Sequence, residues 1–204
     1  MTTHWARKRE TSQTKVREIA LELFLSEGFE AITMEHIAQA SGVSRRSIYR
    51  YFGNKEGIFF SNQRARLERF QALTAHIPPG DSPYAVVLRA VQLLARDIMV
   101  ERESVLAQYR LIEESQSLLP LEANLIREWD DAMLQAIDRG PNQGDPMNKM
   151  VAGAVMGMVR ALLRAWVEGD GQEDLGLMGD RAFEALEKGF NLGPAQQSPS
   201  AEPS

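Results

Sequence analysis

Arginine, serine and tyrosine side chains crowd one short segment of the chain, and these residue types suit contact with nucleic acid. Residues 44–51 read Ser-Arg-Arg-Ser-Ile-Tyr-Arg-Tyr. A guanidinium group can donate paired hydrogen bonds to a guanine edge or a phosphate, and hydroxyl groups suit phosphates. In a helix, Arg46 and Arg50 would share one face, and Arg45 would project from the N-terminal end toward a major groove. The segment therefore predicts a DNA-binding surface; the alternative is a charged face that only contacts solvent.

Two short helices that cross at a glycine would position this segment. Thr33 has the residue type and place of an N-cap for the first helix, whose N-terminus would also suit a phosphate. Gly42 supplies the sharp turn, where a positive φ costs least. Ala38 is small enough for close approach of another helix, and Ile48 lies on the inward face of the second helix. This spacing is typical of a helix-turn-helix over residues 33–52.

The stretch from Val16 to Phe59 resembles the DNA-binding domain of the tetracycline-repressor (TetR) family. The resembling residues are Ile19-Ala20, Leu23-Phe24, Gly28-Phe29, Ile32-Thr33, Ile37-Ala38, Gly42-Val43-Ser44, Ile48-Tyr49, Tyr51-Phe52 and Asn54-Lys55-Glu56. Gly57-Ile58 is a minor departure from the family pattern. The resemblance implies base reading mainly by Arg45, Arg46 and Ser47. With residues added from the segment itself, the predicted DNA-contacting residues are Thr33, Ser44, Arg45, Arg46, Ser47, Tyr49, Arg50, Tyr51 and Lys55.

The rest of the chain also reads as helix, because apolar residues recur with a period near 3.6. Ser12 is the expected N-cap of the first helix, and Gly28 is expected just past its end. Asn54 is the expected cap of a fourth helix, which should end at the proline-rich break at 76–83. Later helices are expected from Pro83 onward and over 104–116, 121–139, 146–168 and 175–190.

The sequence therefore predicts an all-α protein with two domains. Residues 1–60 should form a three-helix, helix-turn-helix DNA-binding domain. Residues 61–192 should form a helical bundle for ligand binding and dimerisation. The tail 193–204 is rich in Pro, Ser and Gln and is expected to be disordered.

Charge is distributed unevenly along the chain. Residues 1–60 contain 9 Lys and Arg and 7 Asp and Glu, which gives a net charge of +2. The other residues carry a net charge of −7, so the whole chain has a net charge of −5. The basic N-terminal quarter is consistent with nucleic-acid binding. The chain has no cysteine, which excludes disulfides and thiolate metal sites. No apolar run approaches the ~20 residues that a membrane span needs, and the polar, basic N-terminus does not read as a secretory signal, so a cytoplasmic location is expected. The TetR resemblance implies that the protein is bacterial.

A second helix pair is predicted to form a homodimer interface. The segment from Val151 is apolar nearly all round, and small residues recur along it. The TetR resemblance implies that the last two long helices build a four-helix interface between two copies. The predicted interface residues are Ala154, Gly157, Ala161, Ala182, Phe183, Leu186 and Phe190. The alternative is that these residues belong to the core of one copy.

Methionine and aromatic residues of the C-terminal domain could line a pocket for a small molecule, because both suit adaptable apolar cavities. The candidates are Met99, Tyr109, Glu113, Trp129, Met133, Met150, Met156 and Trp166. The acidic pair Glu113-Glu114 hints at a cationic ligand. The alternatives are an ordinary core and a solvated acidic pair.

Catalysis is not expected. The three histidines, His4, His36 and His76, are scattered, and no metalloprotease, phosphate-loop or nucleophile-elbow motif occurs. We expect no cofactor and no metal. The predicted function is a repressor that binds a palindromic operator in double-stranded DNA as a homodimer and is released by an unknown small molecule. The alternative is a DNA-binding regulator without a small-molecule inducer.

Overall fold

Residues 4–140 and 142–188 are described by a computed structural model, and within these ranges the chain forms helices and no strand. In chain order the helices are α1 (His4–Glu27), α2 (Met34–Ser41), α3 (Arg45–Phe52), α4 (Lys55–Phe59), α5 (Ser61–Leu73), α6 (Pro83–Val100), α7 (Arg102–Glu114), α8 (Leu119–Ile137), α9 (Pro146–Glu168) and α10 (Leu175–Glu187). The all-α prediction is confirmed. The predicted tail 193–204 and Phe190 lie outside the described residues.

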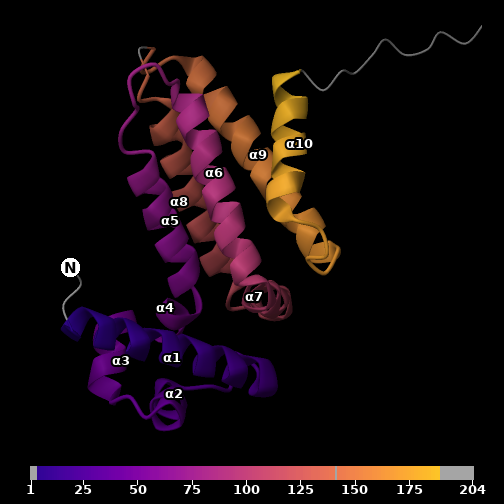
Figure 1. Cartoon of the computed structure of the whole chain (residues 1–204). Helices are drawn as coiled ribbons and strands as arrows, with labels where there is room; N and C mark the ends of the chain where they lie inside the picture. Colours follow the sequence, from indigo (N-terminus) through magenta and orange to yellow (C-terminus); the bar gives the residue numbers. More distant parts are fainter. Residues whose placement is uncertain (1–3, 141, 189–204) are drawn as a thin grey trace, which may run out of the picture.

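The helices form a small head and a longer bundle (Figure 1). Helices α1, α2 and α3 make the head at one end of the molecule, and α4 leads from it into α5. Helices α5, α6, α8, α9 and α10 run lengthwise in the bundle, with α9 packed on α8, and α10 packed on α6 and α9. Helix α7 lies at the base of the bundle and contacts α1. The bundle can therefore act on the head through α4 and α7.

Two expected helix boundaries differ from the structure. Helix α1 begins at His4, so Ser12 lies inside it and is not its N-cap. The expected fourth helix is two helices, because the chain turns at Phe60 between α4 and α5. Phe59 and Phe60 are both buried there, with ring centroids 4.9 Å apart. Adjacent residues of an uninterrupted helix point about 100° apart, so the turn allows both rings to enter the core.

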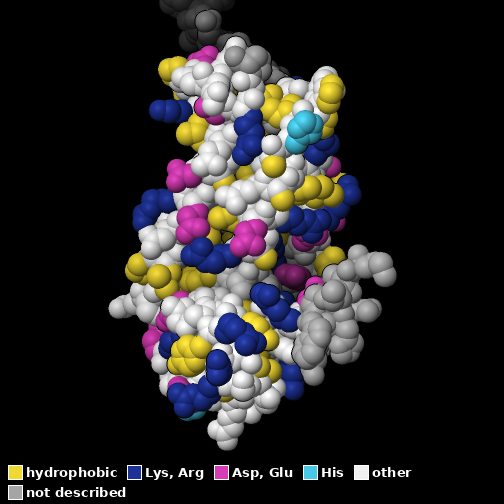
Figure 2. Space-filling view, turned by 90° about the vertical axis from the view of Figure 1, so that its left-hand side faces the viewer, with side chains coloured by type: hydrophobic (Ala, Val, Ile, Leu, Met, Phe, Trp, Pro, Cys, Tyr) yellow, Lys and Arg dark blue, Asp and Glu magenta, His cyan; other side chains and the backbone are white. Residues whose placement is uncertain are grey.

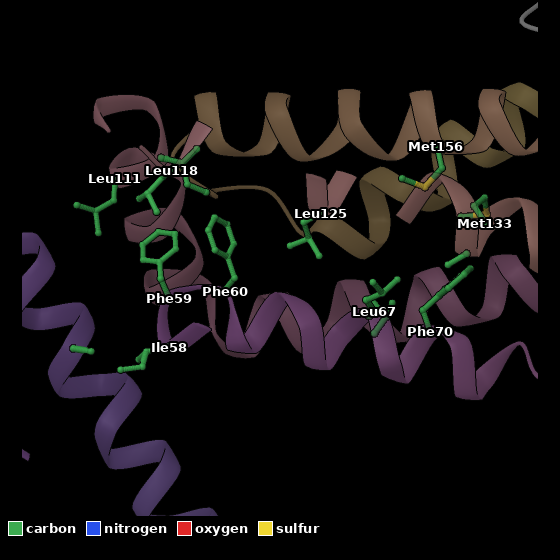
Figure 3. Close-up of a cluster of buried hydrophobic side chains, with 14 of the residues drawn as sticks. Ile58, Phe59, Phe60, Leu67, Phe70, Leu111, Leu118, Leu125, Met133 and Met156 are labelled. Carbon is green, nitrogen blue, oxygen red and sulfur yellow. The ribbon is translucent and has the colours of Figure 1, made fainter. Parts of the chain in front are cut away.

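One hydrophobic cluster runs through both the head and the bundle. In the head, the rings of Phe24, Phe29 and Phe59 lie 4.9–6.0 Å apart. Figure 3 shows Phe59 and Phe60 beside Leu111 and Leu118, which come from α7 and the turn before α8. All four side chains are buried. The predicted boundary between residues 60 and 61 thus falls at a packed junction rather than at an exposed linker.

Helix α9 is strongly apolar along its length. It has 23 residues and a mean hydropathy of 1.5, which is sufficient by length and composition alone to span a membrane, contrary to the expectation from the sequence. A single helix of this kind is weak evidence for a membrane span. Only 22% of its apolar window is buried within one copy of the chain. A large part of its apolar surface is therefore available to another partner.

Candidate DNA-binding surface and ligand cavity

The turn between α2 and α3 has the geometry of a helix-turn-helix. Thr33 caps α2 by accepting a hydrogen bond from the backbone N–H of His36. Gly42 has φ 66° and donates its N–H to the Ala38 carbonyl at 3.0 Å. A residue with a Cβ would be strained at this φ, which is the physical reason for glycine. Ile48 is fully buried under α3, so the opposite face of that helix is turned outward.

The outward face of α3 carries most of the residues predicted to contact DNA. Ser44 caps the helix by accepting from the Ser47 N–H, and its hydroxyl donates to the Ser47 hydroxyl at 3.0 Å. Arg45 and Arg46 are both exposed. Arg45 forms an ion pair with Glu35 of α2. Figure 2 shows Lys and Arg side chains gathered at this end of the molecule. The face can therefore offer guanidinium and hydroxyl groups to one groove.

Two arginine guanidinium groups lie close to the ring of Tyr51. The Arg50 guanidinium lies 5.0 Å from the ring centroid and donates to the Tyr51 hydroxyl at 3.1 Å. Arg9 of α1 lies 5.7 Å from the same centroid. Arg9 was not among the predicted residues, although the basic run at 7–9 was a signal for it. Arg9 lies on α1, which begins at His4, whereas the sequence predicted a first helix that begins after Ser12.

Lys55 has a different environment from the one predicted. Its ammonium donates to the backbone carbonyls of Phe29 at 2.8 Å, Ile32 at 3.1 Å and Glu30 at 3.3 Å. It also lies 4.5 Å from the centre of the Phe29 ring. A lysine ammonium has three N–H donors, and these three carbonyls can occupy all of them. The geometry favours a role in fixing the α1–α2 connection over direct contact with a phosphate.

A polar link joins the same α1–α2 connection to the bundle. The Glu30 carboxylate accepts hydrogen bonds from the hydroxyls of Ser115 at 2.5 Å and Ser117 at 2.9 Å. Both serines lie between α7 and α8. These two donors, Ser115 first, lower the pKa of the Glu30 carboxyl from its ordinary value. The carboxylate is thus held ionised at the contact between head and bundle.

The bundle holds a partly open cavity of about 400 Å³ between α6, α7, α8, α9 and α10, with two residues of α5 in its lining. Five of the eight candidate ligand residues line it: Tyr109, Glu113, Trp129, Met133 and Met156. Its walls are mainly aliphatic, and Phe183 of α10 also contributes. A volume of this size is within the range of small-molecule sites.

The other three candidates lie elsewhere. Met150 is 62% exposed on α9. Trp166 is buried in a second hydrophobic cluster, where its indole N–H donates to the Glu173 carbonyl at 3.0 Å. Met99 packs against that cluster, and its sulfur accepts from the Leu175 N–H. Periodicity could not separate these positions from the cavity wall, because all of them are apolar residues at helical spacing.

The predicted dimer residues fall into two groups. Ala154 and Ala161 are exposed on α9 and Gly157 is half-buried, with open space where a Cβ would stand. On α10, Ala182 and Leu186 are half-buried, whereas Phe183 is buried in the core of one copy. The α9 stripe is therefore open to a second helix, and Phe183 belongs to the cavity wall.

The fold and this surface define a helix-turn-helix DNA-binding protein with a second, helical domain. Residues 12–61 match the family model described as bacterial regulatory proteins, tetR family, and residues 81–191 match the MftR C-terminal domain. The second match alone covers more than half of the 204 residues. The chain therefore belongs to the TetR family of transcriptional regulators.

Two curated relatives agree with this assignment. The mycofactocin biosynthesis transcriptional regulator MftR of Mycobacterium tuberculosis is 27% identical over 167 residues, which are 79% of this chain and 82% of the relative. The regulator TcmR of Streptomyces glaucescens is 37% identical over 119 residues, 54% of this chain and 51% of the relative.

Solved structures share the fold at lower identity. NalD of Pseudomonas aeruginosa, the secondary repressor of the MexAB-OprM efflux pump, is 17% identical with a TM-score of 0.61, over 90% of this chain and 97% of that one. FadR of Thermus thermophilus, a repressor in complex with lauroyl-CoA, is 18% identical with a TM-score of 0.55, over 94% and 100%. At these identities the likeness concerns the fold.

Proposed function

We propose that this chain represses transcription by binding a palindromic operator as a homodimer, and that a small molecule in the bundle cavity releases it. The single observation that carries the DNA-binding part is the outward face of α3, where Arg45 and Arg46 are exposed. This helix is joined to α2 by a turn at Gly42. Arginines at the start of a recognition helix suit base edges of a major groove. A bacterial cytoplasmic location follows from this role.

The α9 surface supports the homodimer. A palindrome presents two half-sites, so two heads must be held about one helical turn of DNA apart, ~34 Å or a multiple of it. Ala154, Gly157 and Ala161 offer a flat, small-residue stripe on an apolar helix that is largely uncovered in one copy. Two copies of α9 and α10 could bury these surfaces together as a four-helix interface.

The cavity and the link at Glu30 support ligand control. Ile112 and Glu113, near the end of α7, line the cavity, and Ser115 follows directly with its bond to Glu30. A ligand that binds better to one arrangement of α7 would shift the head positions and weaken operator binding. The lauroyl-CoA complex of the FadR repressor gives a precedent on this fold. A regulator that uses no small molecule remains the second candidate.

Selection of duplexes from a random pool tests the proposal. The purified full-length chain should retain a palindromic sequence, and binding of that duplex should weaken in the presence of a cavity ligand. Retention of no duplex even at low salt would overturn the DNA-binding role. Retention that no tested ligand changes, with the ligand shown to occupy the cavity, would favour the regulator without an inducer.

A further inference from the structure

We propose that the cavity takes an amphiphilic cation, which is an apolar body that ends in a protonated amine or a quaternary ammonium group. The proposal rests on the proposed ligand control of this site. It commits to the charge of the ligand head, and it follows from how the charged residues around the cavity are paired with one another.

Two of the three arginines that line the cavity already have carboxylate partners outside its lining. The Arg66 guanidinium pairs with Glu101 at 2.5 Å, and that of Arg160 pairs with Asp130 at 2.7 Å. An anionic ligand would have to compete with these carboxylates for either guanidinium. The third lining arginine, Arg164, is exposed and makes no ion pair among the described residues, and it lies one helical turn before Glu168, which also lines the cavity.

Two carboxylates of the cavity lining have no such partners. Glu113 of α7 and Glu122 of α8 both line the cavity, and among the described residues neither makes an ion pair or a hydrogen bond. Glu122 is half-buried, and its pKa is raised by burial first and by the negative charge of Glu113 second. A bound cation would offset both effects, because it supplies the opposite charge in a poorly hydrated place.

Aromatic rings complete the pocket around these carboxylates. Tyr109 and Trp129 line the cavity, and the face of an aromatic ring attracts cations. For Tyr109, burial first and the negative charge of Glu122 second raise the pKa to about 12, so the ring lies in a poorly hydrated place close to that carboxylate. The remaining wall is aliphatic and suits an apolar body.

The test compares ligands that differ only in the charge of the head. Dodecyltrimethylammonium, dodecanol and dodecanoate share a chain length and are added below micelle-forming concentrations to the full-length protein, with binding followed by tryptophan fluorescence. We expect the cation to bind about tenfold more tightly than dodecanol or dodecanoate. Glu122→Gln should remove most of that preference and leave dodecanol binding unchanged. Glu114→Gln is the matched control, because Glu114 is an exposed carboxylate outside the lining.

Dodecanoate binding as tight as that of the cation would overturn the proposal, as would an unchanged cation affinity in Glu122→Gln or no binding of any of the three probes. Operator release is measured separately on the selected duplex. Release by lauroyl-CoA together with no binding of the cation would leave ligand control intact and overturn the cationic assignment. Cation binding that depends on Glu122, with no operator release by the cation or by lauroyl-CoA, would support the cationic site and overturn ligand control.

Discussion

The carboxylate of Glu30 and the hydroxyl of Ser115 are 85 residues apart in the chain and form a 2.5 Å hydrogen bond between head and bundle. Ser115 is buried and Glu30 is exposed, so the bond lies at the edge of the packed junction. Ser117 adds a second donor to the same carboxylate oxygen. The α7–α8 connection is therefore in direct contact with the segment that precedes the helix-turn-helix.

Removal of the Ser115 hydroxyl should weaken the coupling between ligand and operator. In Ser115→Ala, we expect the ratio of operator Kd with and without ligand to fall by about fivefold, since coupling energies of this kind are typically ~1–3 kcal/mol. Fluorescence anisotropy of a labelled operator measures the ratio. Ser117→Ala is the matched control and should change it less, because Ser117 is exposed. An unchanged ratio in Ser115→Ala would show that this hydrogen bond does not carry the signal.

The same carboxylate should make stability depend on pH in acid. The pKa of Glu30 in the folded protein is lowered by its serine donors from an ordinary value of 4.5. Its ionised form therefore stabilises the fold above that ordinary value, and this contribution is lost as the pH falls through the folded pKa. Denaturant unfolding from neutral pH to about pH 3 should show wild type and Glu30→Gln converging in acid. A stability difference that grows in acid would contradict this assignment.

Arg46 should read a base. Arg46→Ala should weaken operator binding by ~1–3 kcal/mol and relax the preference at one position of the half-site, because a bidentate contact to guanine would be lost. Competition with single-base operator variants measures both effects. Arg89→Ala is the matched loss of a positive charge, because Arg89 lies on α6, away from α3, and pairs with Asp81 just before that helix. Equal weakening on all operator variants would instead make Arg46 a phosphate contact.

Lys55 should matter for stability rather than for phosphate binding. Lys55→Met removes the donor to three carbonyls and should lower the free energy of unfolding by ~1.5–3 kcal/mol, as expected for bonds to a charged group. A phosphate contact would instead reduce the slope of log affinity against log salt by about one. We expect that slope to be unchanged when it is measured well below the unfolding temperature. A reduced slope would return Lys55 to the DNA-contacting set.

Gly157 should control assembly. A leucine at this position meets open space within one copy, since nothing lies within 4 Å of the added Cβ. Gly157→Leu should therefore keep the helical content of a single copy, yet it should block close approach of a second α9. Sedimentation velocity should then show a monomer, and operator binding should fall steeply. Val100→Glu changes an 88% exposed residue on α6 and is expected to leave the assembly intact. A dimer that survives Gly157→Leu would place the interface elsewhere.

The local features of the head could be predicted from the sequence because each depends on a few neighbouring residues. Thr33, Ser44 and Asn54 cap their helices as expected, and Gly28 and Gly42 adopt positive φ where the turns require it. Capping and glycine turns involve atoms within about four residues, so a linear pattern records them. The helical class of the protein follows from apolar periodicity for the same reason.

The three-dimensional contacts decided what the linear pattern could not. Lys55 faces carbonyls about 25 residues earlier, Glu30 meets Ser115, and Arg9 reaches Tyr51 on another helix. The cavity keeps Met156 in its wall and leaves Met150 exposed, although both are methionines of one helix. Which face of a helix is covered depends on where the neighbouring helices pack, and that placement is set by the whole core rather than by the residues of the helix itself.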